Sequence, residues 1–185
     1  MDLRRAVPRT FDLTADGARA RPGATGFDAG MLLLRLVVGL TMTAHGAQKL
    51  FGWLGGPGFA GTAHFLEQMG FRPGELLAML SGGAEFGGGL LLAFGLLTPL
   101  GAAAVTGSML AAIATVTSQN GFISAKGGYE YNLVLIASAL AVAFAGPGGL
   151  SLDEALGWHL SGWRWGVGAA VLAVVTAAAV VAVRQ

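Results

Sequence analysis

Five long apolar stretches dominate the chain and restrict what it can fold into. A helix that crosses a lipid bilayer needs about 20 mostly apolar residues, and each stretch comes close to that length. Turn signals separate them, such as Thr98-Pro99 and the glycine-rich run at 146–149. The predicted helices cover residues 27–51, 75–97, 100–118, 129–145 and 163–183. This pattern predicts an all-α fold.

The composition indicates that lipid is the solvent for most of this surface. Hydrophobic residues make up 54% of the 185 residues and charged residues 11%, whereas an average soluble domain has about 25% charged residues. A core of this size cannot hide so much apolar surface from water, so we expect an integral membrane helical bundle with the bilayer as its main partner. The net charge of +1 gives no reason to expect a nucleic-acid partner, and the absence of cysteine excludes thiol chemistry.

The first 27 residues differ from the rest, because they hold five arginines and no apolar run. A secretory signal needs a hydrophobic stretch close behind its basic start, so we interpret residues 1–27 as a disordered, uncleaved cytoplasmic tail. Positively charged segments favour the cytoplasmic side of a membrane. We therefore expect a protein of the bacterial inner membrane with a cytoplasmic N-terminus and, after five spans, an extracytoplasmic C-terminus.

Two glycine-rich connections should lie on the side opposite the tail. Residues 52–74 contain Gly-Gly-Pro-Gly, a short amphipathic stretch at 62–69 and four aromatic residues suited to a membrane interface. We predict that this segment forms a re-entrant or surface-lying flap over a four-helix core at 28–149. Residues 119–128 form the second such loop, whereas 150–162 form a loop on the cytoplasmic side.

Ionisable residues inside the predicted helices are candidates for function, because a charge at membrane depth costs about 2.5–3.5 kcal/mol and usually faces the bundle interior. Arg35, His45 and Lys49 lie in the first helix and Glu85 in the second. Arg35 and Glu85 differ in depth by roughly 8 Å in an antiparallel pair, which makes a salt bridge between them one expectation. Such a pair could also do no more than hold two helices in register.

Further polar residues fall at the level of His45 and Lys49, near the predicted outer surface. We hypothesise that all of them converge on one cavity beneath the flap. The candidate ligand-binding residues are Arg35, His45, Gln48, Lys49, Glu85, Asn120, Tyr129 and Glu130. The alternative for each is structural, with Lys49 extending to the interface and Glu130 stabilising the start of a helix. The three histidines are far apart in the sequence, so no metal site is predicted.

Several motifs follow one another in an order that resembles the DoxX family of small membrane proteins. They are Arg35-Leu36-Val37-Val38-Gly39, His45-Gly46-Ala47-Gln48-Lys49-Leu50-Phe51-Gly52, Gly55-Gly56-Pro57-Gly58, Ala84-Glu85-Phe86-Gly87-Gly88, Gly127-Gly128-Tyr129-Glu130-Tyr131 and Gly146-Pro147-Gly148. The resemblance covers residues 28–153 and implies a four-helix membrane core. The tail and the fifth helix lie outside it.

The resemblance also implies a redox-linked role, because DoxX-like proteins are described as parts of quinone-facing oxidoreductase systems and, in actinobacteria, of complexes that counter oxidative stress. We expect a non-autonomous subunit that binds a quinone or a small anion in an outer-leaflet cavity, docks a redox partner, or both. That partner would be a membrane or extracytoplasmic protein in a multi-subunit complex. No catalytic residue is assigned, since no side chain here is expected to carry electrons.

Two other functions stay open at this point. The first is a non-catalytic membrane anchor or assembly subunit for a partner enzyme, in which the outer loops carry the interaction. The second is a small-molecule or lipid transporter, which is less favoured because the five predicted spans show no inverted repeat and no pair of broken helices.

Overall fold

The computed structural model describes residues 25–184, and the regular structure of this part of the chain is helical. The predicted all-α membrane bundle is therefore confirmed. Four helical segments in this range are long and apolar enough to cross a membrane, and a shorter apolar helix of 16 residues runs beside them. Residues 1–24 of the predicted tail lie outside the described residues.

The first helix, α1 (Gly26–Phe51), begins and ends at residues suited to those positions. The Thr25 side chain accepts from the Asp28 backbone N–H, and the Asp28 carboxylate accepts from the Thr25 N–H at 2.8 Å, which forms a capping box. The helix ends at Gly52, whose φ of +70° is a left-handed conformation that glycine adopts without strain. α1 then lies against α3 (Gly74–Phe94) along most of its length.

Glycines make the close contact between α1 and α3 possible. A Cβ atom at Gly39 would lie 2.6 Å from the Gly89 carbonyl oxygen, and one at Gly46 would collide with the backbone of Phe86. Small residues let transmembrane helices approach in this way. The glycines around Glu85 are therefore packing residues where they face α1.

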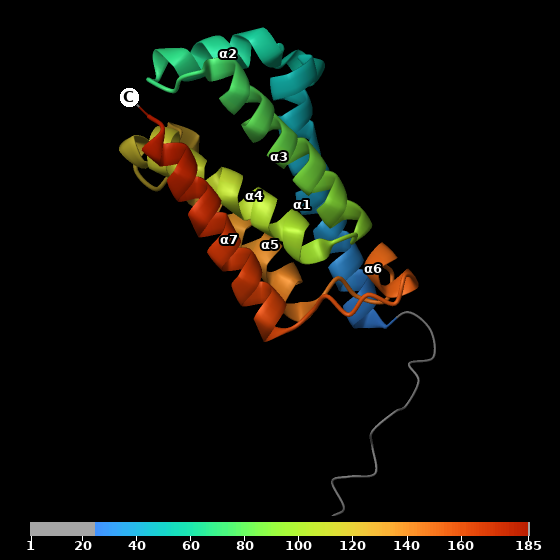
Figure 1. Ribbon diagram of the computed structural model, residues 1–185. Coiled ribbons are helices and arrows are strands. Elements are labelled where there is room, and N and C mark those ends of the chain that lie inside the picture. The colour runs from blue at the N-terminus through green and yellow to red at the C-terminus, as the bar shows by residue number, and fades with distance from the viewer. Residues whose placement is uncertain (1–24, 185) are drawn as a thin grey trace, which may run out of the picture.

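A second group of helices is formed by α4 (Thr98–Ala112), α5 (Glu130–Ala145) and α7 (Trp163–Ala182), which pack against one another beside the α1–α3 pair (Figure 1). α4 continues into a π-helical turn, Ile113–Thr117, and then into 3₁₀ turns at Ser118–Asn120 and Ser124–Lys126. The two groups meet along the contact between α3 and α4, where the buried apolar side chains form one core.

The predicted flap contains a 3₁₀ turn, Trp53–Gly55, and the helix α2 (Gly58–Gln68), which lies across one end of the bundle (Figure 1). The helix begins four residues earlier than the amphipathic stretch predicted at 62–69. The Thr62 hydroxyl donates to the Lys49 carbonyl at 3.1 Å. α2 is thereby tied to the end of α1.

Arg184, just after the end of α7, contacts the residues that follow α2. The Arg184 Nε donates to the Met69 carbonyl at 3.0 Å, and its guanidinium lies 5.8 Å from the centre of the Phe71 ring. Phe71 and Arg184 also form an antiparallel backbone bridge. Since Phe71 is only 1% exposed, this contact anchors α7 to the turn between α2 and α3.

At the opposite end, residues 146–162 fold back onto the bundle instead of forming a free loop. The Gly149 N–H donates to Asp28 Oδ1 at 2.6 Å, which joins this segment to the start of α1. A short helix, α6 (Leu152–Ala155), follows, with Ser151 accepting from the Glu154 N–H at its start. The predicted loop therefore contributes to the core, because its polar side chains are bonded to the helix ends.

Candidate functional site

A cavity of about 600 Å³ lies between the two groups of helices. Its floor is α4, its sides are α3 and α7, and its end is closed by α2 and Phe71. Most of the lining is apolar, from residues such as Leu77, Ala103, Ala111 and Val180. We call this space the α3–α7 cavity. Its volume is within the range of about 300–1,000 Å³ that is typical of small-molecule sites.

The lining of the α3–α7 cavity includes exposed apolar side chains. Three exposed leucines, one from each wall, belong to the lining: Leu80 of α3, Leu100 of α4 and Leu172 of α7. Exposed apolar side chains on a membrane helix contact lipid.

One ion pair is set into the wall of the α3–α7 cavity. Lys49 Nζ lies 2.5 Å from Glu85 Oε1, and both residues line the cavity. The Lys49 side chain is 33% exposed and that of Glu85 only 3%. The second carboxylate oxygen, Glu85 Oε2, is buried and has no hydrogen-bond partner among the described residues. Lys49 and Glu85 are thus the two predicted ligand-binding residues that the fold brings together at a cavity.

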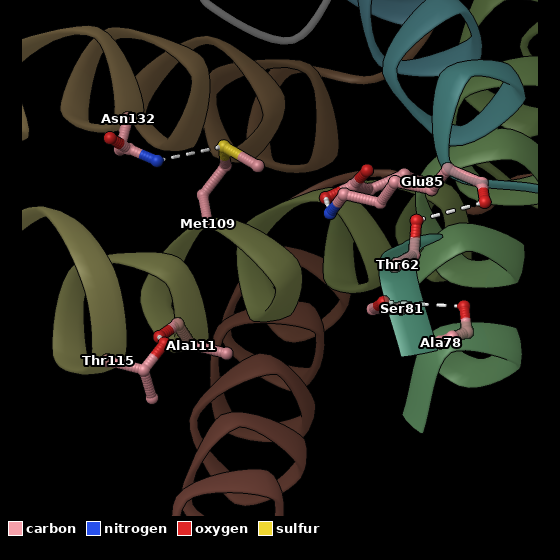
Figure 2. A network of polar contacts seen from close by, with 9 residues as sticks. Thr62, Ala78, Ser81, Glu85, Met109, Ala111, Thr115 and Asn132 are labelled. Carbon is pink, nitrogen blue, oxygen red and sulfur yellow. Dashed lines mark hydrogen bonds and ion pairs between the residues drawn. The ribbon is translucent and has the colours of Figure 1, made fainter. Parts of the chain in front are cut away.

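Hydroxyl side chains form the rest of the polar lining, as Figure 2 shows for three of them. Ser81 donates to the Ala78 carbonyl at 3.4 Å and Thr115 to the Ala111 carbonyl at 2.7 Å, both within their own helices. The π-helical turn at 113–117 places Thr115 and Val116 in the lining. Such turns frequently occur at functional sites.

His45 and Gln48 do not line the α3–α7 cavity, although both lie within one turn of Lys49. His45 is exposed and meets the Tyr131 ring of α5 edge-on, with 6.4 Å between ring centres. Gln48 is half-buried where Gly56 packs against its backbone. Successive i,i+4 positions are offset by about 40° around a helix, because 3.6 residues make a turn. That offset is enough to turn His45 toward α5 while Lys49 faces α3.

The three predicted site residues near α5 shape the loop at 121–130 instead of facing the cavity. Asn120 Nδ2 donates to the Gly127 carbonyl at 3.2 Å, and Glu130 Oε2 accepts from the Ser124 N–H at 3.0 Å. Tyr129 packs edge-on against Phe122, with 5.7 Å between ring centres. These contacts are within one loop, so they support the structural alternative for this group.

The expected salt bridge between Arg35 and Glu85 is wrong, because the register of α1 against α3 separates the two residues. Gly39 packs on Ala93, and Arg35 Nη1 accordingly lies beside Gly95. Glu85 is ten residues before Gly95 in α3, which is about 15 Å along the helix axis. Arg35 and Glu85 therefore lie at opposite ends of the contact between α1 and α3.

Arg35 is fully buried and lies at the end of the bundle away from α2. Its guanidinium donates to the Ala93 carbonyl at 3.3 Å and to the Leu150 carbonyl at 2.6 Å. The opposing charge comes from Asp153, which acts electrostatically on Arg35. Arg35 therefore joins α1, α3 and the 146–162 segment.

Asp153 is a polar residue that sequence reasoning missed. It is fully buried, and its carboxylate accepts from the Leu97 N–H at 2.7 Å, the Thr98 N–H at 2.9 Å and the Thr98 hydroxyl at 2.7 Å. It satisfies the free N–H groups at the start of α4. The signal that could have revealed it was Arg35 itself, since a buried positive charge favours an acidic residue in its surroundings.

Asn132 of α5 is a second buried polar residue that sequence reasoning missed, and Figure 2 shows it beside α4. Its Nδ2 donates to Met109 Sδ at 3.3 Å. It lies in the core and does not line the cavity. Across residues 25–184, no group of three or more His, Cys, Asp or Glu side chains is placed to hold a metal ion.

Comparisons with known proteins agree with this architecture. A model of the DoxX family matches residues 30–118. The chain is 29% identical over 127 residues to "Putative oxidoreductase CatD" of Bacillus subtilis (strain 168), which covers 69% of this chain and 87% of the relative. It is 30% identical over 131 residues to "Inner membrane protein YqjF" of Escherichia coli (strain K12). This alignment covers 70% of this chain and 93% of the relative. No solved structure gives a significant match.

Proposed function

Because the chain belongs to the DoxX family of membrane proteins, we propose that it is the membrane subunit of an oxidoreductase system and binds a quinone in the α3–α7 cavity. One observation carries the proposal. The Lys49–Glu85 ion pair is set into the wall of a mostly apolar cavity whose lining includes exposed leucines. Most small-molecule sites combine an apolar lining with a few placed polar groups in this way.

A quinone fits the position of the cavity as well as its lining. Membrane quinones are apolar rings with two polar oxygens, and they are dissolved in the bilayer. The exposed lining residues Leu80, Leu100 and Leu172 would give a lipid-soluble molecule a lateral entry. A quinone oxygen accepts hydrogen bonds, so its partner in the cavity would be the Lys49 ammonium, which has N–H groups beyond the one that it donates to Glu85.

The electrons must come from another component. The chain has no cysteine and therefore no thiol pair of its own. A partner subunit, or a cofactor that it carries, would supply the redox chemistry, while this chain holds and orients the quinone. The relative CatD bears the name of an oxidoreductase, which supports a redox setting.

A small anion, the other ligand considered from the sequence, is less well supported. Lys49 is the one cation among the described lining residues, and Glu85 already neutralises it. A bound anion would leave a net negative charge in an apolar cavity, which is costly. The neutral quinone avoids this cost.

The test is to extract the protein gently from its own membranes and to quantify co-purifying quinone by mass spectrometry. We expect close to one quinone per protein. Ala111→Leu places a larger side chain in the cavity and should remove most of that quinone. Ala137→Leu is the matched control, because Ala137 is an exposed residue of α5 outside the cavity lining, and it should leave the quinone in place.

The proposal fails if the well-folded wild-type protein carries no quinone, or if Ala111→Leu retains as much as Ala137→Leu. A stoichiometric partner protein recovered without any quinone would favour the alternative of a membrane anchor. The cavity would then be a packing defect filled by lipid.

A further inference from the structure

We infer that the α3–α7 cavity holds a tailed ligand in one direction, with its ring at the end closed by α2 and its hydrocarbon tail toward the end where α6 lies (Figure 1). The inference rests on the proposed function, because it assigns the two parts of a tailed quinone to two parts of the same cavity. Three features carry it: the length of the cavity, the place of its polar side chains and the place of its aromatic side chains.

The cavity is elongated along α4. Its lining includes α4 from Leu100 in the first turn of the helix to Val116 in the π-helical turn that follows it. That span is about 24 Å long at the rise of an α-helix. A quinone ring is much shorter, so a bound ring leaves part of the lining uncovered and room for a second group.

The contact between α3 and α4 fixes the level of Glu85 in this length. The two helices run in opposite directions from a short turn, and a Cβ atom at Gly88 would lie 2.7 Å from Ala104 Cβ. Glu85 precedes Gly88 by one turn and is therefore level with Gly107. From there the lining continues for roughly 10 Å away from α2, as far as Leu100.

Polar side chains lie at the level of Glu85 or nearer to α2. A Cβ atom at Gly107 would lie 2.7 Å from the Thr176 hydroxyl, which places Thr176 at this level too. The polar lining residues at this level and above it are Lys49, Thr62, Ser81, Glu85, Ser108, Thr115 and Thr176. A quinone oxygen accepts hydrogen bonds, and the Lys49 ammonium has N–H groups to donate. The polar ring therefore belongs in this part of the cavity.

The part of the cavity away from α2 is lined by aliphatic side chains. They are Leu100, Ala103 and Ala104 of α4 and Leu172 of α7, which lies one turn before Thr176. A ring oxygen placed among them would lose its hydrogen bonds, which is costly. A hydrocarbon tail has no polar group to satisfy, so this part of the cavity suits a tail.

The aromatic side chains of the lining are at the α2 end as well. Phe65 belongs to α2, and Phe71 follows it in the turn to α3. They are the two aromatic residues among the described lining residues. Aromatic rings favour offset-stacked or edge-to-face contacts with other rings, which a hydrocarbon tail cannot make. This distribution supports the same direction independently of the hydrogen bonds.

The test locates the tail by photolabelling the full-length protein in nanodiscs. The probe is a trimethylquinone with a decyl tail that ends in a diazirine, and labelled residues are identified by mass spectrometry. We expect labelling at 100–104 of α4 and at Leu172. About a hundredfold excess of the same tailed quinone without the diazirine should remove most of it by mass action.

Leu172→Trp should remove most of this labelling, because the larger side chain takes the space of the tail in a close-packed wall. Leu133→Trp is the matched control, since Leu133 is an exposed residue of α5 outside the cavity lining. It should label like the wild-type protein. If Leu172→Trp does not fold, the positions labelled in the wild-type protein still decide the question.

The outcomes separate this inference from the proposed function. Labelling of Phe65, Leu66 or Phe71 that the excess quinone removes would overturn the inference and leave a quinone site in the cavity. Equal labelling of a well-folded Leu172→Trp and of Leu133→Trp would also contradict the inference. If the excess removes no labelling, or only labelling outside the cavity lining, both the inference and the proposed function are overturned.

Discussion

Lys49 and Glu85 form an ion pair in which only the lysine reaches the molecular surface, with side chains 33% and 3% exposed. The two partners therefore differ in what happens when the other is removed. A glutamate left without Lys49 stays buried in an apolar wall, whereas a lysine left without Glu85 can extend its chain toward the interface. The pair should respond asymmetrically to mutation.

We expect Lys49→Met to lower the free energy of unfolding by about 3 kcal/mol, because it leaves a buried charge without its partner. Glu85→Gln should cost only about 1 kcal/mol. The measurement is reversible unfolding by dodecyl sulfate in mixed micelles. The double variant should recover most of the loss caused by Lys49→Met, and equal losses in the two single variants would contradict the argument.

Asp153→Asn should destabilise the end of the bundle away from α2. The carboxylate accepts three hydrogen bonds at the start of α4 and opposes the charge of Arg35, so we expect a loss of about 2–3 kcal/mol. Glu154→Gln, one residue away and exposed, is the matched control and should change stability by less than about 0.5 kcal/mol. Similar melting temperatures for the two variants would show that Asp153 is not structural.

Neighbouring glycines of α3 should respond differently to the same substitution. Gly89→Ala would place a methyl group against the Gly39 carbonyl and Thr43 of α1, with an expected cost of about 2–3 kcal/mol. Gly87→Ala meets no neighbouring atom within 4 Å. It should be neutral or stabilising by up to about 1 kcal/mol, because alanine favours the helix. Thermal unfolding distinguishes them, and equal effects would exclude the close contact between α1 and α3 as the cause.

The orientation in the membrane can be tested with single cysteines, because the chain has none of its own. Ser124→Cys and Ser161→Cys place exposed thiols at opposite ends of the bundle. The arginine-rich N-terminal side is expected in the cytoplasm. A membrane-impermeant maleimide applied from the extracytoplasmic side should therefore label position 124 and spare position 161, and the reverse pattern would show the opposite orientation.

The helices could be predicted from the sequence because the signal is local. A bilayer requires apolar runs of a certain length, and these runs stand in the sequence as continuous segments with glycine or proline between them. The fifth helix could be found in the same way, although the family resemblance does not extend to it. Packing partners are not local in this sense, and the predictions about pairing were correspondingly weaker.

The pairing of Arg35 shows where the sequence stops being informative. Its depth can be estimated by counting residues from the helix ends, but the actual register depends on which glycines of α1 meet α3. That register places Arg35 beside Gly95 and leaves Glu85 to Lys49. Its opposing charge, Asp153, lies in a segment whose sequence is typical of a simple loop.

Which of His45, Lys49 and Glu130 lines the cavity depends on how each helix is rotated about its axis. The hydrophobic pattern does not determine this rotation when most faces of a helix are apolar. Lys49 faces α3, His45 faces Tyr131 and Glu130 holds its own loop. The level of these residues along the bundle was predicted usefully, whereas their direction was not. A cavity beneath the flap was expected, but most of its lining was not, since residues of α4 and α7 complete it and their packing cannot be read from the sequence.

The contacts of Arg184 with Met69 and Phe71 hold the last helix in place as one wall of the cavity. The family model matches residues 30–118, whereas α7 supplies Leu172, Thr176, Ala179 and Val180 to the cavity lining. The matched residues thus carry the ion pair, and a helix outside the match completes the shape around it. Substitutions at the lining positions of α7 would therefore change the shape of the cavity without touching the glycine contacts between α1 and α3.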